Sequence, residues 1–220
     1  MNNENITVFY EGEISSDMPI AVIHTFQNEG DKVFEEYRKL GGRSIVLIAV
    51  QADRWNDTLS PWKAKAVFKG SGDFGCGADE HIAELEKLIR DIRQQTGCTD
   101  SKCAIAGYSF AGLFALYSVF KTDIFSSAVS ASGSLWFCGF REFVLQNDPV
   151  GEIDKIYLSL GDKESKTKNH EMSMVEQNTK DIYDCFVSKG IDCTFEMNSG
   201  GHFNDTEKRL AKGIFDVFGL

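Results

Sequence analysis

Residues 104–113, AIAGYSFAGL, place Ser109 between two apolar runs and among small residues. The run that precedes it, CAIAG at 103–107, is typical of a buried strand. The run that follows, FAGLFALYSVF at 110–120, has leucines and aromatic residues at helical spacing. Ser109 is therefore predicted to lie at a sharp turn from a strand into a helix.

A serine at such a junction forms a nucleophile elbow when it is catalytic. Gly107 and Ala111, two positions before and after the serine, are small enough for a turn in which backbones crowd. The usual second glycine of G-x-S-x-G is replaced here by alanine, with Gly112 one step later. Taken alone this pattern is equally consistent with an ordinary strand-to-helix turn, so other residues must decide.

The rest of the chain alternates apolar strands with amphipathic helices. Residues 6–14 alternate like a strand of a hairpin, and further strands are predicted at 19–26, 44–52, 102–109, 126–133, 155–162 and 193–200. Helical periodicity appears at 79–95, 110–120, 172–190 and 205–218. This order predicts an α/β protein with a three-layer α/β/α sandwich and a mostly parallel sheet.

Composition limits the kind of partner. The 220 residues are 42% hydrophobic and carry a formal net charge of -10. A chain of this length is expected to form one domain, spanning residues 1–220. Its negative charge disfavours nucleic acid and anionic membrane surfaces as partners. We expect a soluble small-molecule partner, and the sequence leaves the oligomeric state open.

Neither a membrane nor a metal is expected. The N-terminal segment MNNENITVFYEGEI lacks the basic and apolar regions of a signal peptide, and no apolar run is long enough to span a bilayer. A cytoplasmic location is therefore expected. Reduced thiols are expected for all six cysteines, Cys76, Cys98, Cys103, Cys138, Cys185 and Cys193. Their spacing fits no zinc motif, and nothing in the sequence points to a metal, nucleotide or flavin cofactor.

A catalytic serine needs a histidine base and an acid that orients the base. His24 lies near the end of a buried-looking strand, His81 begins an exposed helix, and His170 stands among charged residues. His202 instead follows a strand and two glycines at the predicted carboxyl edge of the sheet, where ligands collect in open parallel sheets. His202 is therefore the candidate base.

The acid is expected between Ser109 and His202, after another strand. The segment KIYLSLGDKES, residues 155–165, supplies both Asp162 and Glu164 there. The resulting order of serine, acid and histidine is that of α/β-hydrolases.

Three segments together carry a resemblance to a known family: GYSFAG at 107–112, LGDKES at 160–165 and GGHFND at 200–205. They resemble the α/β-hydrolase superfamily, specifically its putative-esterase branch, which includes esterase D-like, feruloyl and siderophore esterases and the mycolyltransferases. The resemblance spans nearly the whole chain. It implies a serine esterase that acts through an acyl-enzyme on a small-molecule ester, with Ser109, Glu164 and His202 as the catalytic triad.

The resemblance also assigns the finer roles. The acid of related esterases tends to fall three residues after a strand-ending glycine, which favours Glu164 over Asp162 here. The oxyanion hole is implied to consist of the backbone N–H groups of Phe110 and Phe26. Family members usually carry H-G-x after the early strand, whereas this chain has His24-Thr25-Phe26.

Several points stay open at this level. Arg54, Trp55 and Trp62 could line a substrate pocket or pack beneath their loop, and the same choice applies to Ser134 and Trp136. Because only about 55 residues separate the elbow from the acid, a minimal cap or none is expected. An acyltransferase using the same acyl-enzyme, and an inactive binding protein on this fold, are the alternative functions.

Overall fold

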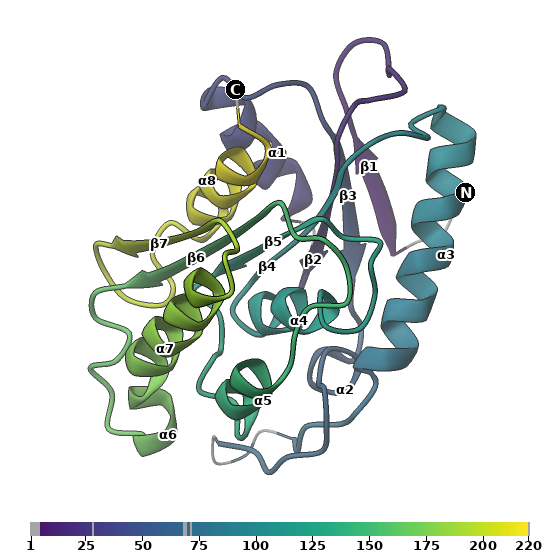
Figure 1. Cartoon of the computed structure of the whole chain (residues 1–220). Coiled ribbons are helices and arrows are strands. Elements are labelled where there is room, and N and C mark those ends of the chain that lie inside the picture. The colour runs from purple at the N-terminus through teal and green to yellow at the C-terminus, as the bar shows by residue number, and fades with distance from the viewer. Residues whose placement is uncertain (1–4, 28, 68–69, 71, 220) are drawn as a thin grey trace.

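The computed structural model describes residues 5–27, 29–67, 70 and 72–219 (Figure 1). The first four residues, which belong to the N-terminal segment MNNENITVFYEGEI, lie outside the described residues. Seven strands form one sheet in the order β1-β3-β2-β4-β5-β6-β7. They are β1 (Ile6–Phe9), β2 (Ile20–Thr25), β3 (Val46–Gln51), β4 (Cys103–Tyr108), β5 (Ser127–Ala131), β6 (Lys155–Gly161) and β7 (Cys193–Asn198). All neighbouring pairs are parallel except β1 with β3.

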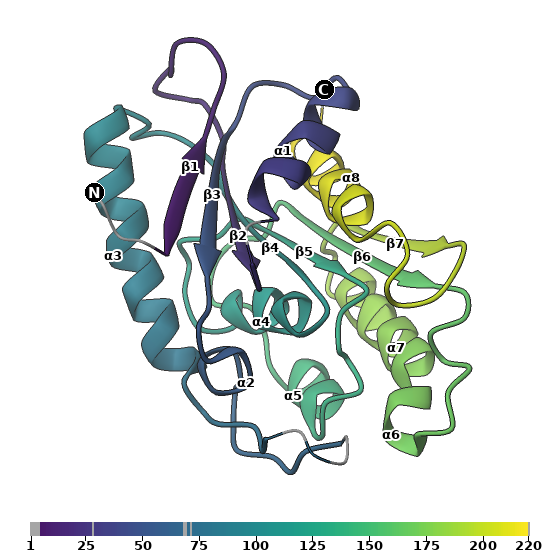
Figure 2. The same ribbon diagram turned by 180° about the vertical axis from the view of Figure 1, so that it is seen from behind.

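Helices cover both faces of this sheet (Figures 1 and 2). One face is covered by α1 (Gly30–Lys39) and α8 (Thr206–Phe218), and the other by α3 (Ala78–Thr96), α4 (Phe110–Ser118) and α7 (Val175–Ser188). Three short helices, α2 (Trp55–Thr58), α5 (Phe140–Gln146) and α6 (His170–Ser173), lie in the connections. The predicted three-layer α/β/α class with a mostly parallel sheet is confirmed.

Burial on both faces explains why the central strands are continuously apolar. Every residue of β2 and β5 is buried, as are all but one of β4 and β6. The two faces have separate apolar cores, one that includes Phe114 of α4 and another that includes Leu210 of α8. Strand β7 is only half-buried because it forms one edge of the sheet.

Two local expectations differ from the structure. The hairpin expected from residues 6–14 does not form: β1 ends at Phe9 and pairs with β3 at the opposite edge of the sheet from β7. Helix α1 was not predicted, although Val33 and Tyr37 lie one turn apart on its buried face. Its many charged residues obscure this short apolar stripe.

The parallel arrangement brings the carboxyl ends of the strands to one edge. Strands β2, β4, β6 and β7 end there at Thr25, Tyr108, Gly161 and Asn198. The connection from β5 to β6 has one helix, α5, which is seven residues long. A connection this short fits the expected minimal cap. Within the described residues, no helix is both long and apolar enough to cross a bilayer.

Candidate active site

Ser109 lies in the turn between β4 and α4 with a strained backbone. Its φ of 59° and ψ of -122° are rare for a residue with a side chain. Its amide donates to the carbonyl of Ala131, and its carbonyl accepts from the amides of Gly112 and Leu113 in the first turn of α4. The structure therefore places Ser109 at the sharp strand-to-helix junction that the sequence predicts.

The small residues around Ser109 are explained by close backbone contacts. A Cβ atom at position 107 would lie 2.1 Å from the carbonyl oxygen of Ala111. A Cβ at position 112 would lie 2.9 Å from Ser130 Oγ and 3.0 Å from the Gly107 carbonyl. Gly107 is thus required by the turn, while Ala111 fits in place of the more common glycine.

His202 lies within hydrogen-bond distance of the serine. Its Nε2 is 2.9 Å from Ser109 Oγ, across 93 residues of sequence. Its own loop is attached to the elbow strand, because the Tyr108 hydroxyl donates to the His202 carbonyl over 2.7 Å. Ser109 Oγ also lies 3.3 Å from the hydroxyl of buried Ser134.

Glu164 faces the other nitrogen of the imidazole. Its Oε2 lies 2.7 Å from His202 Nδ1, and its side chain is only 4% exposed. Its Oε1 accepts from the Gly161 amide at 2.6 Å, the Ser132 hydroxyl at 2.7 Å and Arg209 Nη1 at 3.2 Å. Each carboxylate oxygen thus has its own partners, so the carboxylate cannot rotate freely.

The charge state of Glu164 determines the tautomer of His202. Burial raises the pKa of the Glu164 carboxyl, but hydrogen bonds from His202 and Ser132 outweigh burial and hold this pKa below its ordinary value. An ionised carboxylate only accepts hydrogen bonds, so His202 donates from Nδ1. The lone pair of Nε2 is then free to accept the Ser109 proton.

Asp162, the other acid considered, has no hydrogen bond to the imidazole within the described residues. Its exposed carboxylate accepts from the Gly200 amide at 2.8 Å and so ties the β6 loop to the loop that carries His202. The structure therefore brings Ser109, His202 and Glu164 together and leaves Asp162 in a turn.

Two backbone amides near Ser109 have no acceptor in the part of the chain that the structure describes. Within the described residues, neither the Phe110 N–H at the start of α4 nor the Phe26 N–H after β2 donates to another protein group. Phe26 lines the same cavity as Ser109. Thr25, which replaces the usual glycine, is not among the residues with positive φ, so this position needs no glycine here.

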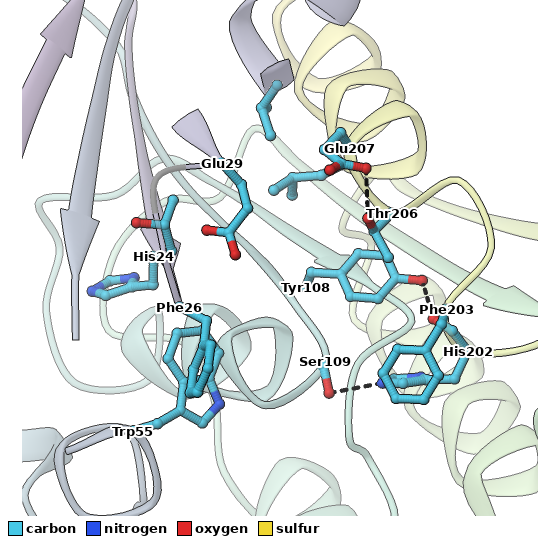
Figure 3. Close-up of a pocket in the computed structure, with 13 residues that line it drawn as sticks. His24, Phe26, Glu29, Trp55, Tyr108, Ser109, His202, Phe203, Thr206 and Glu207 are labelled. Carbon is cyan, nitrogen blue, oxygen red and sulfur yellow. Dashed lines mark hydrogen bonds between the residues drawn. The ribbon is translucent and has the colours of Figure 1, made fainter. Parts of the chain in front are cut away.

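A cavity of about 370 Å³ opens beside Ser109 (Figure 3). In the close-up, Ser109 lies between Phe26 and Trp55 on one side and His202 and Phe203 on the other. This volume is near the lower end of the range for ligand pockets, about 300–1,000 Å³. The cavity can therefore hold one compact group of a small ester.

Of the aromatic candidates, only Trp55 borders this cavity. The Trp55 ring packs edge-on against Phe26 with centroids 5.8 Å apart. Trp62 instead packs against Phe137 and donates from Nε1 to the Cys138 carbonyl. Trp136 packs against Phe74, and Arg54 pairs with Asp57 on the surface.

The expectation that His81 lies on an exposed helix face is wrong. His81 is buried because the first turn of α3 packs over α4, and its ring contacts Phe114. Its Nε2 lies 2.9 Å from Nε2 of buried His24, and its Nδ1 lies 3.2 Å from Glu84. No sequence pattern points to this pair, whose members are 57 residues apart.

Metal-ligating residues do not gather in the described part of the chain. No group of three or more His, Cys, Asp or Glu side chains there has the geometry to hold an ion. All six cysteines are free thiols.

Two comparisons of the sequence match this chain to known proteins. The family model described as "Putative esterase" matches residues 3–205. "Uncharacterized protein YbbA" of Bacillus subtilis (strain 168) is 22% identical over 171 residues, covering 76% of this chain and 68% of that protein.

Solved structures share the fold at low identity. The BES protein of Bacillus cereus is 14% identical with a TM-score of 0.70, covering 100% of this chain and 97% of that one. The enterobactin and salmochelin hydrolase IroE is 17% identical with a TM-score of 0.68, covering 98% and 89%. The enterobactin esterase FES of Shigella flexneri is 16% identical with a TM-score of 0.68, covering 96% of this chain. The chain spans only 54% of the length of FES.

Proposed function

The chain belongs to the "Putative esterase" family and is a carboxylic ester hydrolase, and we propose that it acts through an acyl-enzyme formed on Ser109. The observation that carries this proposal is the continuous chain of short contacts from Ser109 Oγ to His202 Nε2, at 2.9 Å, and from His202 Nδ1 to Glu164, at 2.7 Å. The serine end of this series of contacts borders a cavity large enough for a small substrate. A serine hydroxyl is a weak nucleophile without such a base.

In the proposed first step, Ser109 Oγ attacks the ester carbonyl while His202 Nε2 takes the hydroxyl proton. The negative charge on the former carbonyl oxygen is held by the N–H groups of Phe110 and Phe26. Collapse of this intermediate expels the alcohol, which leaves with the proton from His202. The acyl group remains on Ser109.

In the second step, water attacks the acyl-enzyme while His202 Nε2 removes its proton. The second tetrahedral intermediate then expels Ser109, which regains its proton from His202, and the carboxylic acid departs. Glu164 stays ionised throughout and stabilises the positive charge of the imidazolium. Both half-reactions use the same oxyanion donors.

The proposed substrates are small-molecule esters. The printed names of FES and IroE assign those proteins to enterobactin and salmochelin. Because FES is nearly twice as long as this chain, the substrate named for FES is not assigned to this chain. The cavity volume favours an ester with one compact group.

Labelling with a fluorophosphonate probe tests the nucleophile directly. We expect one probe per chain on Ser109, located by mass spectrometry, together with an initial burst of alcohol from an activated aryl ester. Ser188→Ala, an exposed serine of α7, serves as a matched control that keeps both signals. Labelling of Ser109→Ala to the wild-type extent would refute the proposal.

A further inference from the structure

The cavity beside Ser109 has an uneven charge. Apart from histidines, two of the described side chains that line it are charged at neutral pH, and both are glutamates. They are Glu29 at the start of α1 and Glu207 in the first turn of α8. No lysine or arginine of the described chain lines it. In Figure 3 the carboxylate of Glu29 points into the cavity, and Glu207 lies across from it beside Thr206.

Hydrogen bonds hold both carboxylates without cancelling their charge. Both oxygens of Glu29 accept from the Gln27 amide, at 3.1 and 2.9 Å. Glu207 accepts from the Thr206 hydroxyl at 2.6 Å, and this bond is the main reason that the pKa of Glu207 lies below its ordinary value. Lys32 has a smaller effect on Glu207, and neither carboxylate forms an ion pair with a described lysine or arginine.

Helix dipoles offset only part of this charge. The N-termini of α1 and α8 each contribute the equivalent of about half a positive charge. Two carboxylates carry two full negative charges, so a negative charge remains at this end of the cavity. The chain as a whole has a net charge of -10, which adds to the same field.

Aromatic rings form much of the remaining wall. Phe26 and Phe203 are 63% and 89% exposed, although large aromatic side chains are usually buried. Together with Trp55 they present ring faces and edges beside the nucleophile. Ring faces attract organic cations, and carboxylates do so more strongly.

We propose that the group of the substrate that fills this cavity carries a positive charge, specifically an ammonium group attached to apolar carbon. This inference rests on the proposed function, because it concerns the ester that Ser109 attacks. The apolar carbon contacts the floor formed by Val33 and Leu210 and the aromatic walls, while the ammonium group faces Glu29 and Glu207. Esters with a carboxylate in the same place are repelled.

Two series of matched esters test this inference. The first keeps a p-nitrophenyl leaving group and varies the acyl group: 4-(trimethylammonio)butanoyl, its neutral isostere 5,5-dimethylhexanoyl, and anionic glutaryl. The second keeps butyrate and varies the alcohol: choline, its neutral isostere 3,3-dimethylbutanol, and 3-hydroxypropanoate. The series that shows the preference identifies the part of the ester that enters the cavity.

We expect kcat/KM to follow the order cationic, neutral, anionic in one of the two series. The cationic ester should exceed its neutral isostere by roughly tenfold, the size of one partly desolvated charge contact. In Glu29→Gln and in Glu207→Gln this ratio should fall toward one. Glu171→Gln, which removes an exposed carboxylate of α6 outside the cavity, should leave the ratio unchanged.

Equal kcat/KM values within both series would overturn the inference while leaving ester hydrolysis by Ser109 intact. A cation preference that survives both glutamine substitutions would also overturn it. Binding of choline and 3,3-dimethylbutanol to Ser109→Ala, measured by calorimetry, separates the inference from the proposed function. Tighter binding of choline without any wild-type hydrolysis would refute the function alone, and equal binding would refute the inference alone.

Discussion

Arg209 Nη1 lies 3.2 Å from Oε1 of Glu164, while Oε2 of the same carboxylate faces His202. Arg209 is 3% exposed and comes from α8. The same guanidinium contacts Ser132 Oγ at 3.0 Å and the Ser199 carbonyl, also at 3.0 Å. It thus joins the loops after β5, β6 and β7, and we assign it as a positioning residue for the acid.

Arg209→Gln is expected to lower kcat by up to roughly 10²-fold with little change in KM, because Glu164 loses the contact that fixes its orientation. Loss of the buried positive charge also leaves the Glu164 carboxylate less compensated, so the hydrogen-bonded acid–base pair holds a proton more tightly. The acid limb of the pH–rate profile should therefore move to higher pH.

Rescue distinguishes positioning from a general loss of folding. Arg209→Lys keeps the charge without the planar fork, so its acid limb should stay near that of the wild type while kcat recovers in part. Rates are expressed per active site, titrated with a fluorophosphonate probe. Lys208→Gln, on the exposed side of the same helix, is the control. An unmoved acid limb in Arg209→Gln would contradict the assignment.

The backbone strain at Ser109 predicts an unusual order of stability. Both Ser109→Ala and Ser109→Gly should lose several orders of magnitude in kcat, since both lack the nucleophile. Glycine relieves the cost of a φ of 59°, so Ser109→Gly should be the more stable of the two by about 1 kcal/mol.

Denaturant unfolding of the two variants measures this difference. At Asp184, an exposed position inside helix α7, the glycine variant should instead be the less stable of the two, because glycine costs roughly 0.5–1 kcal/mol relative to alanine in a helix interior. Equal stability of Ser109→Ala and Ser109→Gly would mean that the turn stores no strain.

The two acids after β6 should differ sharply in their effect on catalysis. Glu164→Gln keeps the shape of the side chain but places an amide, which can donate a hydrogen bond, where the carboxylate accepts one from His202. We expect kcat to fall by roughly 10³–10⁴-fold. Asp162→Asn keeps an oxygen acceptor for the Gly200 amide and should retain most of its activity.

Both variants are compared on one activated ester, with thermal unfolding as a check on folding. A larger loss in Asp162→Asn than in Glu164→Gln would make Asp162 the orienting acid. Small and equal losses would instead indicate a serine-histidine dyad.

Local patterns were sufficient to predict the elements that carry Ser109, Glu164 and His202. Each of these residues follows an apolar strand, and parallel strands bring their carboxyl ends to one edge. The position of Glu164 rested on a family resemblance, and the structure places that residue, not Asp162, beside His202. Its catalytic role, a single domain and a cytoplasmic location all stay predictions.

Contacts between distant segments could not be predicted in the same way. Arg209 lies in an amphipathic helix among lysines and reads as a solvated charge, yet it contacts an acid 45 residues earlier. His81 has the sequence environment of an exposed helix start, and its burial depends on how α3 packs over α4. Such pairings follow from tertiary packing, which a single sequence pattern does not encode.

The buried pair His24 and His81 predicts that stability depends on pH. Burial lowers the pKa of His24 well below its ordinary value, with a smaller effect from His81. Burial also lowers the pKa of His81, against a weaker opposing effect from Glu84. In the unfolded chain both imidazoles take up protons near their ordinary pKa of about 6.5.

Below that pH the unfolded state therefore binds more protons than the folded state. The free energy of unfolding should be greatest above about pH 6.5 and fall as the pH drops, by up to about 1.4 kcal/mol per pH unit for each histidine. Denaturant unfolding between about pH 7.5 and about pH 5.5 measures this slope. His81→Gln should make the slope shallower, whereas His170→Gln, at an exposed position in α6, should leave it unchanged. A slope that is the same in wild type and His81→Gln would show that the folded protein protonates this pair without cost.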